Sequence, residues 1–259
     1  MHRTFFQPSF IVLLFLLSSC FGHHPDKNAD CQGCQAVTQH PERSFVRILG
    51  AVGPDLVVTA SGSVIANDEV GSYILTAAHV CTFLEGSGIP PELQDKKDLI
   101  IPHLSLHGQF FNAKMSPLVI VTYEERDDLC LMYAPLHREV GLSVTKDLPE
   151  VDTKYRSISS PGGKAAPGRV LTFEGYYAGS YPIPEENFEG DLYTIWNAKG
   201  GSGSPILNSD NQIVGIISRV MSDGTPAVIS PNTKALQTFV QRALCVAEVE
   251  GFECSEAGD

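Results

Sequence analysis

Residues 75–81 read Leu-Thr-Ala-Ala-His-Val-Cys, residues 126–132 read Arg-Asp-Asp-Leu-Cys-Leu-Met, and residues 200–205 read Gly-Gly-Ser-Gly-Ser-Pro. A histidine, an acid and a serine thus follow one another along the chain. A serine hydroxyl is a poor nucleophile near neutral pH, so it needs a base that takes its proton. His79 is the candidate base, Asp128 the candidate group that orients the imidazole, and Ser202 the candidate nucleophile. The three segments together favour nucleophilic catalysis.

Each segment alone also fits a structural role. A histidine in an apolar run can be a partly buried structural residue, paired acids before a strand can cap a turn, and a glycine-serine run can be a flexible loop. The order of the three segments, with β-type runs between them, favours a joint role. Asp127 competes with Asp128, and we prefer Asp128 because it directly precedes the apolar run 129–132.

The rest of the chain predicts an all-β fold. Many short apolar or alternating runs are separated by Gly, Pro, Asn and Asp, from residue 45 to residue 229. One helix is expected near the C-terminus, with Ser230 as its N-cap and Pro231 as its first residue. These features favour a β-sandwich or β-barrels closed by a C-terminal α-helix.

The three segments resemble, in the same chain order, the His, Asp and Ser motifs of the chymotrypsin/trypsin family of serine peptidases. The resemblance extends over about residues 44–247 and implies an all-β, chymotrypsin-like fold of two antiparallel six-stranded β-barrels with a C-terminal α-helix, whose site lies in the cleft between the barrels. The first barrel would span 44–149 and the second barrel with the helix 150–247, followed by a tail over 248–259. It also implies that the backbone amides of Gly200 and Ser202 form an oxyanion hole. Gly201 stands where digestive members carry an Asp that pairs with a newly cut N-terminus, so that mode of activation is not expected here.

The sequence around the histidine looks more like two bacterial branches, the high-temperature-requirement peptidases and the glutamyl endopeptidases. No PDZ or other appended domain is expected. By alignment, the substrate pocket has its floor at Trp196 and Asn197 and one wall at Ser218, Arg219 and Val220. The floor has no Asp, which disfavours cleavage after Lys or Arg, and Ile217 replaces the histidine of glutamyl endopeptidases. A preference for small or medium apolar side chains is expected.

The N-terminus predicts export. An apolar run over 10–17 suits a signal peptide, and it ends in Leu17-Ser18-Ser19-Cys20. This ending resembles a bacterial lipobox, which implies a signal peptide over 1–19, lipidation of Cys20 and a polar tether over 20–43. The protein would then be anchored to the bacterial membrane and face the periplasm or the exterior. The alternative is an ordinary cleaved signal in which Cys20 has no role.

Composition excludes some partners. The chain has 18 Lys and Arg against 30 Asp and Glu, a formal net charge of -12, and no basic run, so we expect no nucleic-acid partner. Of seven cysteines, six remain after Cys20, an even set that favours disulfides in an exported protein. Cys31 and Cys34 form a CxxC pair, which could be a redox motif or half a zinc site, but no thioredoxin-like βαβ pattern surrounds it. His103 and His107 are a candidate metal pair without a visible third ligand, so no metal or cofactor is expected.

Protein or peptide outside the cytoplasm is the expected substrate. Two other accounts stay open at this point. One is a catalytically inactive member of the fold that acts as a binding or adhesion module at the cell surface. The other is a quality-control factor that holds unfolded proteins. The complete set of three candidate residues argues against the first, and the missing PDZ domain argues against the second.

Overall fold

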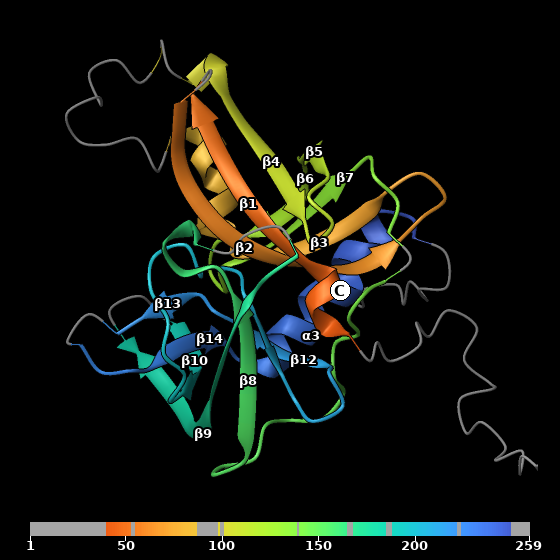
Figure 1. Ribbon diagram of the computed structural model, residues 1–259. Coiled ribbons are helices and arrows are strands. Elements are labelled where there is room, and N and C mark those ends of the chain that lie inside the picture. The colour runs from red at the N-terminus through yellow and green to blue at the C-terminus, as the bar shows by residue number, and fades with distance from the viewer. Residues whose placement is uncertain are drawn as a thin grey trace, which may run out of the picture. The chain divides into compact units, whose positions relative to one another are not determined.

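Two antiparallel sheets make up the folded part of the chain, which a computed structural model describes over residues 40–52, 55–86, 98, 101–138, 140–164, 168–184, 188–221 and 224–249 (Figure 1). The first sheet runs in the order β5-β4-β1-β2-β3-β7-β6, and the second in the order β12-β11-β8-β9-β10-β14-β13. All of these elements lie in the same compact unit, 32–259.

The strands of the first sheet are β1 (Phe45–Val52), β2 (Asp55–Asn67), β3 (Ser72–Thr76), β4 (Leu104–Phe110), β5 (Met115–Pro117), β6 (Val119–Glu124) and β7 (Leu129–Ala134). Those of the second sheet are β8 (Lys154–Ser159), β9 (Leu171–Ile183), β10 (Phe188–Tyr193), β11 (Pro205–Leu207), β12 (Ile213–Ile216), β13 (Arg219–Val220) and β14 (Val228–Pro231). The described helical segments are η1 (Pro41–Ser44), α1 (Ala78–Cys81), η2 (Thr82–Glu85), η4 (Ile101–His103), η5 (Pro161–Gly163) and α3 (Thr233–Val246).

Each sheet closes on itself because one run of residues pairs with one end of the sheet in its first part and with the other end in its second part. The first sheet ends in β5 and β6, which only Leu118 separates, so its two ends must lie side by side. The second sheet ends in β12 and β13, which only Ile217 and Ser218 separate. If each interrupted run is counted as one strand, each sheet has six strands. The predicted all-β fold of chymotrypsin-like type is confirmed, with seven hydrogen-bonded segments in each sheet where six continuous strands were expected.

The sequence explains where strands bury one face or both. In β4 the burial alternates, with Leu106, Gly108 and Phe110 inside, as expected of a strand with one face toward the core. In β3, which lies between β2 and β7, every residue is buried, so both faces of this strand are shielded from solvent. β3 ends at Thr76, and α1 follows after Ala77. This fully buried strand therefore leads directly into the helix that carries His79.

The C-terminal helix is present, but its predicted start is wrong by two residues. α3 begins at Thr233, and its N-cap is Asn232, whose side-chain oxygen accepts the backbone N–H of Ala235 at 2.8 Å. Ser230 and Pro231 belong to β14. The hydroxyl of Ser230 instead accepts the backbone N–H of Ile216, so tertiary contact with β12 overrides the local capping signal.

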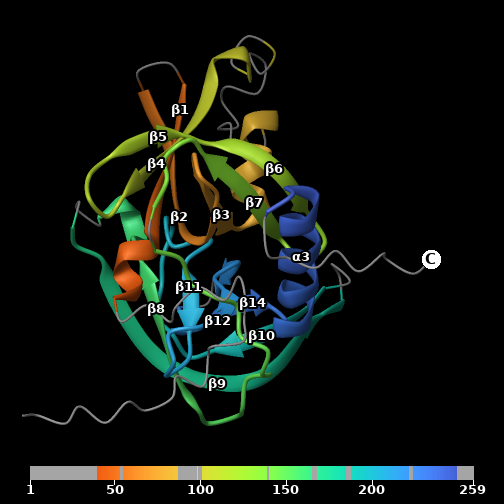
Figure 2. The same ribbon diagram turned by 90° about the vertical axis from the view of Figure 1, so that its right-hand side faces the viewer.

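α3 joins the two sheets. It contacts β6 and β7 of the first sheet and β12 and β14 of the second, as Figure 2 shows. Its buried residues recur at helical spacing and include Leu236, Phe239 and Val240. None of the helices in the described residues is long and apolar enough to cross a membrane.

The predicted signal peptide, Cys20, and most of the predicted tether lie outside the described residues, as do Cys31, Cys34 and the end of the predicted tail. The last residues of the predicted tether, 41–43, belong to η1, where Pro41 and Ser44 are buried. The proposed boundary at residue 44 stays a prediction.

Candidate active site

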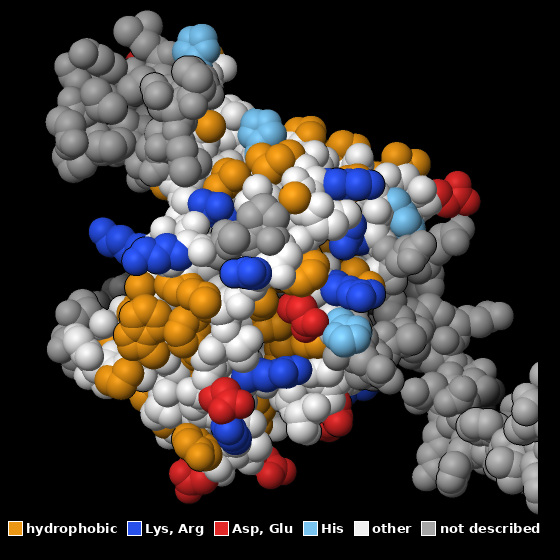
Figure 3. Space-filling model, in the orientation of Figure 1, with side chains coloured by type: hydrophobic (Ala, Val, Ile, Leu, Met, Phe, Trp, Pro, Cys, Tyr) orange, Lys and Arg blue, Asp and Glu red, His pale blue; other side chains and the backbone are white. Residues whose placement is uncertain are grey.

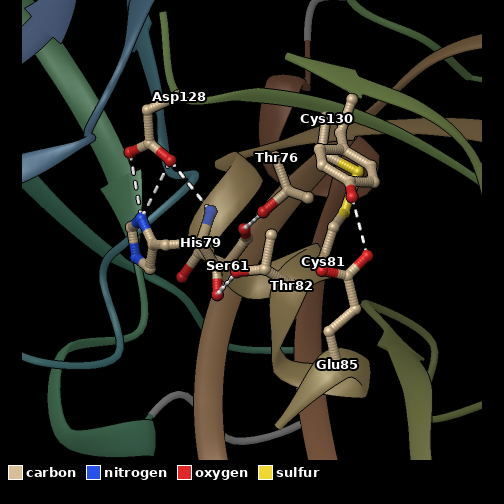
Figure 4. The surroundings of a disulfide bond; sticks show 9 residues. Ser61, Thr76, His79, Cys81, Thr82, Glu85, Asp128 and Cys130 are labelled. Atoms are coloured by element: carbon tan, nitrogen blue, oxygen red, sulfur yellow. Dashed lines mark hydrogen bonds and ion pairs between the residues drawn. A yellow bond between two sulfur atoms is a disulfide. The ribbon is translucent and has the colours of Figure 1, made fainter. Parts of the chain in front are cut away.

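His79 and Asp128 are paired directly. The imidazole Nδ1 of His79 lies 2.9 Å from Oδ2 and 3.1 Å from Oδ1 of Asp128 (Figure 4). The backbone N–H of His79 also donates to Oδ1, at 2.9 Å. The carboxylate therefore fixes both the backbone and the ring of the histidine. With Nδ1–H donating to Asp128, a neutral imidazole presents Nε2 as a proton acceptor.

Asp128 is held on its far side by Ser218. The hydroxyl of Ser218 donates to Oδ2 at 2.5 Å. The side chain of Asp128 is only 11% exposed whereas that of His79 is 49% exposed. A charge this far from solvent needs hydrogen-bond donors around it, and His79 and Ser218 supply them. A sheltered carboxylate suits the role of an orienting group, and an accessible imidazole suits the role of a base.

A disulfide ties together the two elements that carry this pair. Cys81 on α1 is two residues beyond His79, and Cys130 on β7 is two residues beyond Asp128. They are bonded, with 6.5 Å between their Cα atoms, and both are fully buried. The bridge appears beside the pair in Figure 4. This confirms that at least some of the cysteines form disulfides, and Cys245 is disulfide-bonded as well.

Ser202 lies on a loop of the second sheet that hydrogen bonds attach to the first. Its carbonyl accepts the backbone N–H of Ser61 on β2 at 2.8 Å. The next residue, Gly203, donates its N–H to the carbonyl of Ile217, the neighbour of Ser218, at 2.7 Å. Ser202 is thus held between β2 and the segment that binds Asp128. Among the described residues its hydroxyl makes no hydrogen bond, neither to His79 nor elsewhere.

The peptide units around Ser202 have a definite orientation. The carbonyls of residues 199–202 all accept hydrogen bonds, from Gly162 N–H (2.5 Å), Ser61 Oγ (2.9 Å), Ser204 N–H (3.0 Å) and Ser61 N–H (2.8 Å) respectively. The N–H groups of Gly201 and Gly203 donate to Ala198 and Ile217. Within the described chain, those of Gly200 and Ser202 donate to nothing. They are therefore available for an external acceptor, as an oxyanion hole requires.

Two serines matter here in ways that the sequence did not indicate. Ser218 was predicted as a pocket wall, and the structure shows that its hydroxyl binds Asp128. Ser61 was not singled out at all, although it binds both Gly200 and Ser202. Neither contact has a local sequence signal, because the partners are 90 and 139 residues apart.

A pocket of about 510 Å³ opens beside His79. Its lining residues come from α1 and η2, from the turn before β7, and from the segment that follows β12: Ala78, His79, Thr82, Glu85, Glu125, Asp128, Ser218 and Arg219. Glu85 accepts the hydroxyl of Tyr123 at 2.7 Å, and this hydrogen bond raises the pKa of Tyr123. At about 510 Å³, the pocket that the His79 imidazole borders is large enough for substrate side chains.

The other predicted pocket residues lie in different settings. Asn197 is 5% exposed, and its amide group pairs with the hydroxyl of Ser159 at 3.1–3.2 Å. Trp196 is 49% exposed and packs on Phe173, with ring centroids 5.1 Å apart. The guanidinium of Arg219 lies 4.6 Å from the ring centroid of Phe188. The role of these residues in substrate selection stays a prediction.

Strands of the second sheet carry exposed apolar side chains. Figure 3 shows a hydrophobic group over the region of β9, β10 and β13. The large exposed hydrophobic residues on or next to these strands are Leu171, Tyr176, Trp196 and Val220. Of these residues, Val220 belongs to the predicted pocket wall and Trp196 to its predicted floor.

Asp127 has a different environment from Asp128. Burial raises the pKa of Asp127, and the nearby charge of Glu124 adds to this effect. It makes no contact with His79 among the described residues. The same part of the chain contains no group of three or more His, Cys, Asp or Glu residues arranged to hold a metal ion. The arrangement of His79, Asp128 and the 200–203 loop fits nucleophilic catalysis assisted by a base.

Comparison with known proteins agrees with the fold. A family model described as a trypsin-like peptidase domain matches residues 60–216. The inactive form of a serine-to-alanine mutant of Rv3671c from M. tuberculosis H37Rv is similar in structure, with 14% identity and a TM-score of 0.58, over 83% of this chain and 94% of that chain. A serine endoprotease from Yersinia pestis is also similar, with 13% identity and a TM-score of 0.56, over 81% of this chain and 65% of that chain.

No curated protein matches the sequence. The two solved structures are too distant in sequence to show more than the fold. The family model, however, covers more than half of the chain and includes His79, Asp128 and Ser202. The chain therefore belongs to the family of trypsin-like peptidase domains.

Proposed function

We propose that the protein is a serine endopeptidase that hydrolyses peptide bonds through an acyl-enzyme. Ser202 is the nucleophile, His79 is the general base and then the general acid, and Asp128 orients the imidazole and stabilises the imidazolium. The observation that carries the proposal is the pair His79–Asp128 at 2.9 Å, with the carboxylate sheltered and the imidazole exposed.

The reaction proceeds in two acyl transfers. His79 takes the proton of Ser202 as the oxygen attacks the substrate carbonyl, and the C–N bond then breaks as the imidazolium gives that proton to the leaving amine. Water, deprotonated by His79, then attacks the ester, and the ester C–O bond breaks as the imidazolium returns that proton to the oxygen of Ser202 and the peptide acid leaves. In both steps the carbonyl oxygen becomes negative, and the free N–H groups of Gly200 and Ser202 are its proposed donors. The missing hydrogen bond between Ser202 and His79 does not oppose this, since such contacts often tighten only with substrate bound.

The sheet edge next to the site supports a peptide substrate. β13 is an end strand and pairs on one side with β14. Ser218, just before this strand, and Arg219, its first residue, line the pocket. An extended peptide can add to such an edge through its main chain while its side chains enter the pocket. The preference for small or medium apolar side chains at the cleavage site is retained as part of the proposal.

Hydrolysis of an unfolded protein such as reduced casein tests the proposal. The wild-type protein should produce peptides, and Ser202→Ala, of equal folding stability, should not. Cleavage that persists in Ser202→Ala would assign the activity to other residues. If the wild-type protein binds the substrate without cleaving it, the account of an inactive binding module is correct instead.

We also propose that the mature protein is lipid-anchored through Cys20, with residues 1–19 removed on export. The support is the sequence of residues 10–20 alone, an apolar run that ends in two small residues before a cysteine. Expression in a bacterium that is fed an alkyne fatty acid should label the wild-type protein and recover it with membranes. Cys20→Ala should remove the label, and a wild-type protein without label would refute the anchor.

A further inference from the structure

We infer that Ser61 is a positioning residue for the oxyanion hole, and this inference rests on the proposed function. Ser61 lies on β2 of the first sheet, whereas the loop that it holds belongs to the second. Its hydroxyl and its backbone N–H bind two carbonyls of that loop, so that the N–H groups of Gly200 and Ser202 stay directed toward the substrate.

All of the hydrogen-bonding groups of Ser61 are engaged. Its hydroxyl donates to the carbonyl of Gly200 at 2.9 Å and accepts the backbone N–H of Ser160 at 3.3 Å. Its N–H donates to the carbonyl of Ser202 at 2.8 Å. Its carbonyl accepts the hydroxyl of Thr76 at 2.8 Å, a contact drawn in Figure 4. Since Thr76 is the last residue of β3, just before α1, Ser61 connects the loop of the nucleophile to the strand that leads to the base.

The loop needs such an anchor because of its composition. Gly200 has φ 94°, and the peptide unit between two glycines has few steric limits on its rotation. The other end of this unit, the N–H of Gly201, donates to Ala198 within the same loop, so this bond does not tie the unit to another strand. The carboxylate that would pair with an N-terminus in digestive peptidases is replaced by Gly201. The hydroxyl of Ser61 is the contact that fixes the Gly200 carbonyl to the first sheet.

Ser63 provides a matched control. It lies two residues further along the same strand and is fully buried, as Ser61 is. Its hydroxyl has no hydrogen-bond partner within the described chain. Replacing Ser63 by alanine therefore removes the same atom from a similar buried position without breaking a hydrogen bond.

The first test compares steady-state kinetics of Ser61→Ala and Ser63→Ala on a chromogenic peptide. Ser61→Ala should lower kcat about 3- to 10-fold, the rate equivalent of one hydrogen bond, with KM unchanged within about 2-fold. A peptidyl boronate, whose oxygen occupies the same hole, should bind more weakly by the same factor. Ser63→Ala should match the wild-type protein. If both variants have the same kcat, or if only KM changes in Ser61→Ala, the inference is wrong.

The second test does not need activity. Amide hydrogen exchange at Gly201 and Gly203, whose N–H groups are hydrogen-bonded in the loop, should be faster in Ser61→Ala than in Ser63→Ala. Equal exchange in the two variants would overturn the inference even for an active protein. If the wild-type protein has no peptidase activity and exchange is still faster in Ser61→Ala than in Ser63→Ala, the proposed function is refuted but Ser61 remains the anchor of the loop. If Ser61→Ala does not fold, Ser61→Cys, which keeps a weaker donor, allows the same comparisons.

Discussion

At the scale of single residues, Gly203 shows how closely the two sheets approach at the site. It has φ 80°, and a Cβ atom there would lie 2.1 Å from Oγ1 of Thr76 and 2.2 Å from the carbonyl oxygen of Ser61. No side chain fits without moving β2 or β3. The glycine after the proposed nucleophile is thus required by packing as well as by its backbone conformation.

Replacement of Gly203 by alanine should therefore destabilise the protein strongly. We expect a loss of about 3 kcal/mol or more in the free energy of unfolding, together with loss of peptidase activity. Gly224→Ala is the control, because Gly224 has φ 84° and a Cβ atom there would have no neighbour within 4 Å. It should cost only about 1–2 kcal/mol, the penalty for the left-handed conformation. If urea unfolding shows the same loss in the free energy of unfolding for both variants, the close contact of Gly203 with β2 and β3 adds nothing to the penalty for the left-handed conformation.

The two adjacent acids differ in role, and this difference can be measured. Asp128→Asn should lower kcat by about 10⁴-fold with a small change in KM, because an amide favours the wrong tautomer of His79. Asp127→Asn should leave both constants nearly unchanged, since Asp127 has no contact with the imidazole among the described residues. Comparable losses in the two variants, measured on the same peptide, would contradict the assignment of Asp128.

At the scale of elements, two connections join parts of the first sheet to one another. The disulfide between Cys81 and Cys130 joins α1 to β7 across a sequence separation of 49 residues. The turn between β2 and β3 is closed by Asp68, whose Oδ1 accepts the N–H groups of Val70 and Gly71 at 2.8 and 2.6 Å. Both connections lie within the part of the fold that carries His79 and Asp128.

The disulfide should contribute to stability mainly by restricting the unfolded chain. The double variant Cys81→Ala/Cys130→Ala should lose about 2–4 kcal/mol in urea unfolding. Because both cysteines are fully buried, a mild reductant should not reach the disulfide in the folded protein. It should reduce the disulfide only after the chain has unfolded, and the reduced protein should then be less stable. A double variant as stable as the wild-type protein would show that hydrogen bonds alone hold α1 on β7.

The turn at Asp68 predicts a pH effect. Burial raises the pKa of Asp68, but the N–H groups of Gly71 and Val70 and the hydroxyls of Tyr73 and Tyr133 outweigh it and lower the pKa below its ordinary value. The folded state thus prefers the ionised form. Its stabilisation is present above the pKa of the unfolded chain and is lost as the pH falls through the lower, folded value.

Asp68→Asn should therefore be less stable than the wild-type protein by about 1 kcal/mol at pH 7. This difference should shrink as the pH falls from the ordinary pKa of an aspartate through the lower, folded-state pKa of Asp68, because the wild-type carboxylate then becomes protonated. Urea unfolding of both proteins from neutral to acidic pH measures it. A difference that stays constant with pH would show that the charge of Asp68 does not contribute.

At the scale of the whole molecule, the architecture could be predicted because the relevant signals are local. Alternating runs, turn residues and the segments around His79, Asp128 and Ser202 are each read within a few neighbouring residues. The contacts of Ser61 and Ser218 could not be predicted, because they depend on how two sheets meet. The helix start was misplaced for the same reason, since Ser230 is a good cap locally and is used by β12 instead.

The central claim is that His79, Asp128 and Ser202 act together although they come from separate parts of the chain. Labelling with a fluorophosphonate tests it most directly, because this reagent reacts with a serine hydroxyl only when the base and the oxyanion hole are in place. Peptide mass spectrometry should find one adduct, on Ser202, in the wild-type protein, and none in Ser202→Ala or His79→Ala. A folded wild-type protein that stays unlabelled, or that carries the adduct on another serine, would contradict the account.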